Sequence, residues 1–454
     1  MRPVRAGDAP ARARLAGFSG QAGETCELLD PGRILLVGVG PAGLPLSQGM
    51  ERAGACAVSK LLELPRVALD LRGWPPDEAT AFLTGAVLRA WRFDRLKPRR
   101  ETGAPCLSRI DVITDDPGEL RPVWDRAGCV LEGVAFARAL VAEPANRLTP
   151  AHLIARLDWL TAAGVELGVL DGRALHRAGL GGLLAVGAGS ANPPALAVLR
   201  WRGTIKADPV VFVGKGITFD TGGICIKPAA GMEVMGDDMA GAAACAGAML
   251  ALALRRSPAP AIAVLALAEN AVGGSSYRPS DVLRMANGST VEVIDTDAEG
   301  RLALADALAW SCQQLRPAAL VDLATLTGTI ITALGCQMAG LFDNDPAFAA
   351  QVAAAGSAVG EPAWRMPIGH SHREDLVSDI ADIRQCVMGQ YQPDSSQAAA
   401  FLREFVGTVP WVHLDIAGME TRGEATDQHA AGPSGYGVRL LDRLVAQRFE
   451  DPHR

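Results

Sequence analysis

The sequence contains few aromatic residues and no excess of positive charge. Phe, Trp and Tyr make up 5% of the 454 residues, the formal net charge is −7, and the pI is about 5.6. Proteins that bind nucleic acids usually carry a basic stripe, often with aromatic side chains that stack on bases. No such stripe is present, since the basic stretch 89–100 is typical of a solvated helix end. We therefore expect no nucleic-acid partner.

The chain also lacks paired cysteines, a signal peptide and a long apolar run. Its nine cysteines are scattered and include no C-x-x-C pair, which excludes a zinc knuckle and a disulfide framework and suits a reducing compartment. The N-terminus has arginines but no apolar core of signal length, and no run of 18 apolar residues is present to span a membrane. We expect a cytoplasmic protein without membrane contact.

Several catalytic motifs are missing as well. The absence of H-E-x-x-H argues against a zincin, and the absence of G-x-S-x-G argues against a serine hydrolase. A calcium loop with D-x-D-x-D-G spacing is also absent. The seven histidines are dispersed; His413 is expected in the core, and Cys225 has no neighbouring histidine to act as a base.

Hydrophobic residues make up 49% of the chain, which is enough for large buried cores. The length indicates two or three domains. A long amphipathic helix ends near Glu143 and another begins after Thr149, so we place a boundary near residue 145. The predicted fold is α/β, with a smaller N-terminal α/β domain (1–145) and a larger catalytic domain (146–454).

In the larger domain, short apolar runs alternate with helical patterns. Strands are expected at 165–170, 182–189, 195–201, 209–214, 261–269, 290–295, 319–326 and 411–418, helices at 149–163, 238–256, 300–315, 346–359 and 396–406, and a polar loop at 384–396. This alternation predicts a mixed sheet covered by helices on both faces.

The smaller domain contains one glycine fingerprint. Gly38, Gly40 and Gly43 follow the buried strand 33–37 in a G-x-G-x-x-G pattern, which dinucleotide-binding domains share. The acid expected about 20 residues later could be Glu63, but its context, LLELPRVAL, is poor. We favour a tight strand-to-helix turn and keep a nucleotide-binding enzyme as an alternative.

Two stretches of the larger domain gather acids and cations among glycines. The first, 213–241, contains Lys215, Asp220, Lys227, Asp237 and Asp238, and the second, 295–301, contains Asp295, Asp297, Glu299 and Arg301. Both follow buried strands, and ligand sites of α/β sheets lie beyond the carboxyl ends of strands. If strands 209–214 and 290–295 are neighbours, the two stretches meet. We expect Asp238 to cap the helix that follows it.

These residues suit a pair of divalent cations. Four carboxylates (Asp220, Asp238, Asp297 and Glu299) would balance two doubly charged ions, and carboxylate oxygens are ligands that hard cations prefer. Asp237 is better explained as a cap or surface residue. Arg301 would be an exposed charge disfavoured by the helix dipole unless an anion lies beside it.

The motifs resemble the leucyl aminopeptidase (cytosol aminopeptidase) family of dinuclear metallopeptidases. The matching segments include VGKGITFDTGGICIKP (213–228), DDMAGAA (237–243), DTDAEGRLALADAL (295–308) and ATLTGTIITALG (324–335). The second-domain resemblance extends over roughly 130–445, whereas the N-terminal part resembles the family only in outline.

The resemblance implies a role for each site residue. Lys215, Asp220, Asp238 and Glu299 would hold one metal ion, and Asp220, Asp297 and Glu299 the other, more exchangeable one, as Mn²⁺ or Zn²⁺. Lys227 and Arg301 would be catalytic, with bicarbonate held at Arg301 as the general base. Met235, Thr325 and Leu326 would line the pocket for the first side chain or hold the peptide backbone. The family is usually hexameric.

Two positions depart from the family pattern. Asp295 replaces the usual Asn of the signature and adds a possible negative charge near the metals, and Ala240 stands where Gly is frequent.

The sequence therefore predicts a metal-dependent aminopeptidase that releases leucine and other apolar N-terminal residues. The alternatives are a dipeptidase or cysteinylglycinase on the same site, and a nucleic-acid-binding regulator on the same fold. The acidic balance and the complete set of site residues count against a purely binding role.

Overall fold

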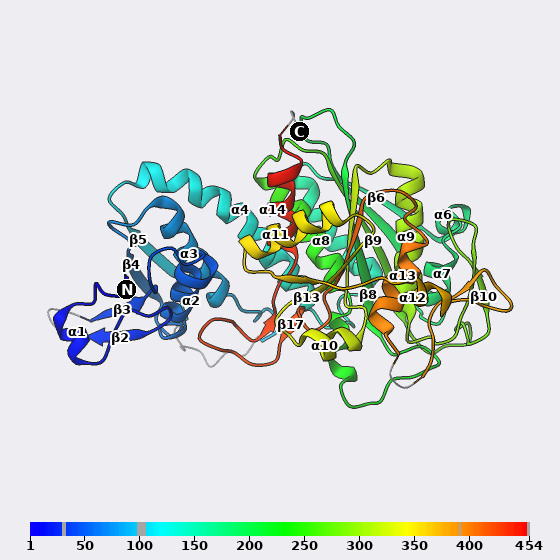
Figure 1. Cartoon of the computed structure of the whole chain (residues 1–454), viewed down its shortest axis with the longest axis horizontal. Coiled ribbons are helices and arrows are strands. Elements are labelled where there is room, and N and C mark those ends of the chain that lie inside the picture. The colour runs from blue at the N-terminus through cyan, green and yellow to red at the C-terminus, as the bar shows by residue number, and fades with distance from the viewer. Residues whose placement is uncertain (30–32, 98–105, 390–391, 452–454) are drawn as a thin grey trace. The chain divides into compact units, whose positions relative to one another are not determined.

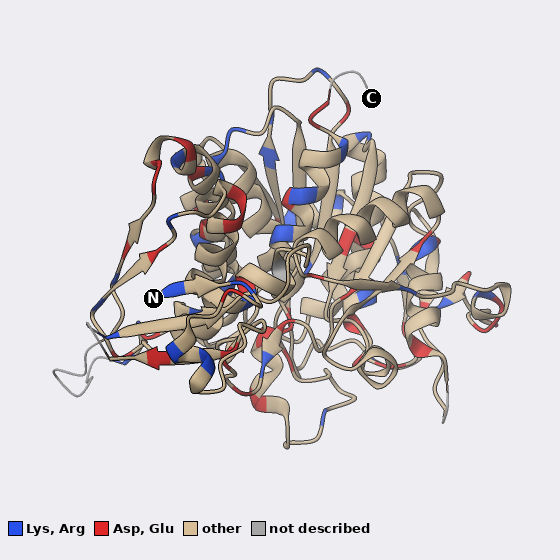
Figure 2. Cartoon of the chain, turned by 60° about the vertical axis from the view of Figure 1, so that its left-hand side comes forward, with Lys and Arg blue, Asp and Glu red and all other residues tan. Residues whose placement is uncertain are grey.

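The chain forms two compact units, shown in Figure 1. The structure, a computed structural model, describes residues 1–29, 33–97, 106–389 and 392–451. The first unit comprises Met1–Leu131 and Arg422–Gly432, and the second comprises Glu132–Thr421 and Pro433–Arg454. Figure 2 shows basic residues interspersed with acidic ones along the ribbon. The predicted class, α/β with a smaller N-terminal and a larger C-terminal domain, is confirmed.

The N-terminal unit consists of two small sheets with helices. Its elements are β1 (Arg2–Val4), α1 (Ala11–Leu15), β2 (Thr25–Leu28), β3 (Ile34–Gly38), η1 (Ser47–Glu51), α2 (Arg52–Ser59), β4 (Arg66–Asp70), α3 (Pro76–Ala90) and β5 (Arg109–Ile113). One sheet has the order β1-β3-β2 and the other pairs β4 with β5. Val37, Leu69 and Phe82 are among the buried residues of its core.

The glycine fingerprint forms a turn that follows β3. A Cβ atom at Gly38 would clash with the backbone of Gly20 and Gln21, and Gly40 has a φ of +78°. Both positions therefore need glycine for packing and for backbone conformation. This geometry supports the prediction of a tight turn, and it explains the pattern without a nucleotide.

A long helix, α4 (Pro117–Val141), leads from the first unit into the second. The division by contacts falls within this helix, after Leu131, whereas the sequence places a boundary after the helix near residue 145.

The second unit contains the elements from α5 onward, apart from the segment between β17 and β18. They are α5 (Pro150–Leu157), η2 (Asp158–Ala163), β6 (Glu166–Asp171), α6 (Gly172–Arg177), α7 (Gly181–Gly187), β7 (Ala195–Trp201), β8 (Val210–Asp220), η3 (Met232–Asp237), α8 (Ala240–Leu254), β9 (Ala261–Asn270), β10 (Val282–Arg284), β11 (Thr290–Glu292), α9 (Glu299–Leu315), β12 (Ala319–Ala324), α10 (Gly328–Leu334), β13 (Ala339–Asp343), α11 (Pro346–Ala358), β14 (Ala363–Arg365), α12 (His370–Glu374), β15 (Ile383–Arg384), α13 (Asp394–Arg403), β16 (Trp411–Asp415) and α14 (Val438–Arg448). The short pair β17 (Thr421–Arg422) and β18 (Gly432–Pro433) flanks the segment that belongs to the first unit.

An eight-stranded mixed sheet forms the centre of this unit. Its order is β14-β13-β16-β12-β8-β9-β7-β6. The middle strands β16, β12, β8 and β9 are parallel. β13 pairs antiparallel with β16 and parallel with β14, and β7 pairs antiparallel with both β9 and β6. Both faces of β8 and β9 are buried, which explains the continuous apolar runs at the start of β8 and along most of β9.

Helices cover both faces of the sheet, as predicted. Figure 1 shows α8, α11 and α14 on one side and α7, α9 and α13 on the other. α8 lies very close to the sheet, since a Cβ atom at Gly214 of β8 would come within 2.5 Å of the Ala242 Cα atom. The many small residues of α8 permit this approach. The segment Met232–Leu254 is apolar and long enough to cross a membrane, but 83% of its most apolar window is buried inside the fold, as in a core helix.

One predicted strand is wrong. Residues 182–189 were expected as a strand, but Gly181–Gly187 form helix α7. The segment has no capping side chain of its own. Instead, the Asp306 carboxylate of α9 accepts a hydrogen bond from the Leu183 backbone N–H at 2.9 Å. A residue 123 positions away thus satisfies a free N–H of the first turn, which local patterning does not reveal.

Candidate metal centre and active site

Strand β8 carries the first two site residues. It continues past residue 214, where the sequence analysis ended it, to Asp220, with an irregular register between Ile217 and Asp220. Lys215 therefore lies within the strand and Asp220 at its end. The strand's position between β12 and β9 places both residues in the middle of the sheet.

The Lys215 ammonium group lies among oxygen atoms. Its Nζ atom is 2.8 Å from Asp238 Oδ1 and 2.9 Å from Glu299 Oε1, and it donates to the Thr325 carbonyl at 2.8 Å. Burial disfavours its charge, but the nearby carboxylates, first Asp238 and then Glu299, outweigh burial and raise the pKa of Lys215. This lysine is buried within a cluster of acids and is not a surface residue.

Lys227 pairs with the other two carboxylates. Its Nζ atom is 2.9 Å from Asp220 Oδ2 and 2.5 Å from Asp297 Oδ1. Its side chain is 21% exposed, compared with 4% for Lys215. Partial burial opposes its charge, but Asp220 and Asp297 raise the pKa of Lys227, so it remains an ammonium at neutral pH.

The four carboxylates form one cluster with unused oxygen atoms. Oxygen atoms of Asp220, Asp297 and Glu299 lie within 4.8 Å of one another. Asp238 Oδ2 and Glu299 Oε2 are buried and have no hydrogen-bond partner in the protein. Burial raises the pKa of Asp297 to about 7 and also raises the pKa values of Asp238 and Glu299. Buried, unpaired carboxylate oxygens are costly without cations, so the donor set fits divalent ions.

The predicted capping role of Asp238 is wrong. Helix α8 begins at Ala240, its N-cap is Met239, and no side chain caps it. Asp238 instead accepts a hydrogen bond from the Thr325 hydroxyl at 2.7 Å and pairs with Lys215. The carboxylate is therefore directed into the cluster.

The route by which the second acidic stretch reaches the cluster also differs from the prediction. Residues 290–292 form β11 in a separate three-stranded sheet, β10-β11-β15, so this strand is not a neighbour of β8. Glu299 comes instead from the first residue of α9. The two stretches do meet, but a loop and a helix start bring the second one there.

Residues that the sequence analysis missed hold this loop. The Gln385 side chain accepts from the Ile294 and Asp295 backbone N–H groups at 2.6 and 3.1 Å and donates to the Ala298 carbonyl at 3.2 Å. Gln385 is fully buried. It lies about 90 residues along the chain from the loop and in no motif, so only the tertiary structure identifies it.

Asn270 links the end of strand β8 to the loop that precedes α9. Its amide donates to Asp220 Oδ1 at 2.8 Å and to the Thr296 carbonyl at 3.0 Å. The Thr296 hydroxyl in turn donates to the Gly222 carbonyl at 2.7 Å. Nothing in the local sequence around Asn270 indicates these contacts.

Arg301 is buried rather than exposed. Its Nη2 atom donates to Asp394 Oδ1 at 2.8 Å, and its Nη1 atom donates to the Gln385 carbonyl at 3.3 Å. Asp394 is the first residue of α13, which begins two residues earlier than the predicted helix at 396. Part of the predicted 384–396 loop, residues 390–391, lies outside the described residues. Asp394 lies in no motif of the sequence and was not among the predicted site residues.

The three expected substrate-binding residues lie on two segments. Thr325 and Leu326 follow β12, and Thr325 contacts the cluster through both Asp238 and Lys215. The Leu326 backbone N–H donates to the buried Asp415 carboxylate at 3.1 Å. Met235 is half-buried in η3, which packs against β8.

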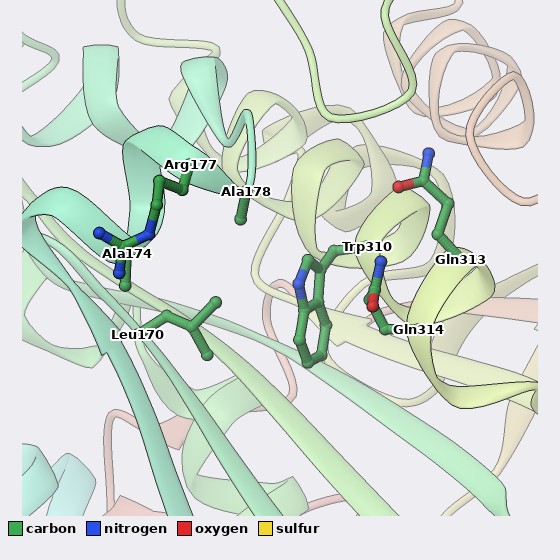
Figure 3. A pocket seen from close by; sticks show the side chains of 7 residues that line it. All are labelled: Leu170, Ala174, Arg177, Ala178, Trp310, Gln313 and Gln314. Atoms are coloured by element: carbon green, nitrogen blue, oxygen red, sulfur yellow. The ribbon is translucent and has the colours of Figure 1, made fainter.

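The predicted core histidine is confirmed, since His413 is fully buried and its Nδ1 atom lies 2.6 Å from Asp322. A hollow of about 520 Å³ lies elsewhere on this unit (Figure 3). It is lined by Leu170, Ala174, Arg177, Ala178, Trp310, Gln313 and Gln314, none of which belongs to the acidic cluster.

Comparison with known proteins agrees with this geometry. The profile of the cytosol aminopeptidase family's catalytic domain matches residues 135–442, and the profile of that family's N-terminal domain matches residues 11–100. The chain belongs to the cytosol aminopeptidase family. It is therefore a peptidase of a metal-dependent aminopeptidase family, as the resemblance implied.

Relatives in this family are similar over nearly their whole length. A probable cytosol aminopeptidase of Brucella ovis is 43% identical, over 98% of this chain and 92% of the relative. One from Rhizobium etli is 41% identical, over 96% and 90%. Among solved structures, the bottromycin maturation enzyme BotP in complex with Mn has a TM-score of 0.89 and 35% identity, with 98% of each chain covered.

Proposed function

We propose that this cytosol aminopeptidase family member releases N-terminal residues from peptides, with leucine and other apolar residues preferred. The observation that carries the proposal is the cluster in which two lysines interleave with four carboxylates at the end of β8 and the start of α9. Paired divalent ions are the usual partners of such a carboxylate set in hydrolases.

The proposed ligands divide between two ions. Lys215, Asp220, Asp238 and Glu299 would hold one ion, and Asp220, Asp297 and Glu299 the other. When bound, two such ions would lower the pKa of a shared water toward neutrality and supply the nucleophile. Mn²⁺ and Zn²⁺ both suit the set, since carboxylates accept either ion. For Lys215 to serve as a ligand, its Nζ atom has to give up a proton.

Lys227 is proposed to remain an ammonium group and to stabilise the oxyanion that forms on the scissile carbonyl. A preorganised cation at this position contributes mainly in the transition state. The raised pKa of Lys227 supports this role, because the group stays charged at neutral pH. Arg301 is proposed to hold an anion beside the reaction, and bicarbonate is the dissolved anion that the family resemblance implies there.

Met235, Thr325 and Leu326 are proposed to receive the first residue of the substrate. Two of the three have apolar side chains, and exposed Val234 adjoins Met235. Apolar lining favours apolar side chains over charged ones, because burial of each methylene gains about 0.8 kcal/mol.

We further propose a homohexamer in the cytoplasm, acting on peptides and on neither nucleic acid nor membrane. The names of the relatives, cytosol aminopeptidases, support the location. Light scattering tests the assembly, and a fully active monomer at micromolar concentration would contradict it.

The test of the activity compares leucine amide, N-acetyl-leucine amide, a dipeptide and a longer peptide with N-terminal leucine. An aminopeptidase cleaves the leucine amide and both peptides but spares the acetylated substrate. Cleavage of the dipeptide alone would instead indicate a dipeptidase. DNA binding by filter retention without any hydrolysis would indicate the regulator.

A further inference from the structure

Arg301 already has an anionic partner within the chain. Its side chain is 4% exposed and pairs with Asp394, whose side chain is 32% exposed. A buried guanidinium group is costly unless it is paired and hydrogen-bonded. Asp394 supplies that charge, and the Gln385 carbonyl supplies a second acceptor.

Asp394 is held in place by a chain of hydrogen bonds. The next residue, Ser395, shares hydrogen bonds of 2.6 Å with the hydroxyls of Thr327 and Thr329. The Thr327 hydroxyl donates to the buried Asp415 carboxylate at 2.6 Å. The start of α13 is thereby fixed to the segment that follows β12 and carries Thr325 and Leu326. Asp394 thus has a defined position beside Arg301.

We propose that the Asp394 carboxylate is the anion that Arg301 holds beside the reaction. This carboxylate takes the place on the guanidinium group that a dissolved anion such as bicarbonate would otherwise occupy. This inference rests on the proposed aminopeptidase function and assigns part of that function to a residue of the chain itself.

With Asp394 in this place, a residue of the chain itself can serve as the general base. Asp394 Oδ1 stays on Arg301, and the other carboxylate oxygen, Oδ2, accepts one proton from the attacking water. The water oxygen bonds to the carbonyl carbon, the C–N bond breaks, and the same proton passes to the departing amine. No proton is gained or lost over the cycle at Asp394.

The test uses the metal-loaded full chain in buffer free of carbon dioxide, with formate and bicarbonate as probe anions. Asp394→Ala should lower kcat by about 10²-fold, the lower end of the range for a general base. About 50 mM formate or bicarbonate should restore it at least tenfold, and the wild type should change less than twofold. Asp394→Asn, which keeps the side-chain shape, should lose kcat similarly.

Asp375→Ala is the matched control. The Asp375 carboxylate of the wild type accepts a hydrogen bond from Gln397 of α13 at 2.8 Å and pairs with Gln397, not with Arg301. The variant should keep its activity and gain no response to formate. Calorimetry adds a readout without turnover, since formate should bind to Asp394→Ala and not to the wild type.

The outcomes separate this inference from the proposed function. A metal-loaded wild type that cleaves no aminoacyl substrate would refute the proposed function. An active wild type stimulated tenfold by bicarbonate would overturn the inference alone. So would an Asp394→Ala variant that is fully active, or one that neither binds formate nor is rescued by it.

Discussion

Gly300→Ala offers a direct test of the role of Lys215, because the added methyl group would meet the Lys215 side chain and no other neighbour as closely. Gly300 is the second residue of α9, and a Cβ atom there would lie 2.5 Å from Lys215 Cε and 2.7 Å from Lys215 Nζ. Both distances are shorter than real carbon contacts allow. The neighbour is the end of a flexible side chain, so the Lys215 amine should shift away from Asp238 and Glu299.

Two effects follow from this shift, one on the stability of the metal-free protein and one on metal binding. In the metal-free protein the shift weakens the buried pairs of Lys215 with Asp238 and Glu299, so the variant should unfold at a lower temperature than the wild type, although Ala is favoured over Gly in helices by up to about 1 kcal/mol. Loss of a correctly oriented ligand should weaken metal binding by about 10–100-fold or more, which corresponds to about 1.4–2.8 kcal/mol. The ion held by Asp220, Asp297 and Glu299 should be affected less.

Calorimetric titration with Mn²⁺, together with thermal unfolding of the metal-free chain, measures both effects. Gly128→Ala in α4 is the matched control, since no atom lies within 4 Å of the added Cβ position. It should bind both ions as the wild type does. If Gly300→Ala also binds two ions with wild-type affinity, Lys215 is not a ligand and the assignment is wrong.

Three further predictions concern other residues. Asp220→Ala and Glu299→Ala should each weaken binding of both ions, whereas loss of only one ion in calorimetry would show that the residue does not bridge. Lys227→Ala should lower kcat by about 10²–10³ with metal content unchanged, as for the loss of an oxyanion donor, and metal loss in that variant would make the lysine structural. Burial raises the pKa of Asp306 to about 7, above its unfolded value of about 3.9. Its contribution to stability is therefore complete below about pH 4 and is lost as the pH rises through about 7. The thermal midpoint should fall more between pH 5 and 8 in the wild type than in Asp306→Asn, and equal falls would refute this assignment.

The composition of the acidic cluster could be predicted from the sequence because its members lie in two short stretches. Lys215, Asp220 and Lys227 fall within 13 positions of one another. Alternation of apolar runs with helical patterns was also enough to predict the mixed sheet, since burial on both faces leaves a continuous apolar signal in β8 and β9.

Long-range partners could not be predicted in this way. Residues 182–189 were predicted as a strand from their apolar run. The feature that marks them as helix α7, the hydrogen bond from Leu183 to Asp306, comes from far along the chain. Asp394 pairs with Arg301 across 93 positions, from a stretch without a motif. Gln385 and Asn270 hold the ligand segments by side-chain amides, which leave no periodic pattern. Local patterning identified the candidate ligands, and tertiary contacts position them.

Two divalent ions in this cluster are proposed to drive hydrolysis at the N-terminus of peptides. Metal analysis combined with hydrolysis of leucine amide, before chelation, after prolonged chelation and after reconstitution, tests it most directly. We expect two ions per chain, no hydrolysis after their removal, and recovery with Mn²⁺ or Zn²⁺. Full activity in a preparation shown to be free of metal would contradict it.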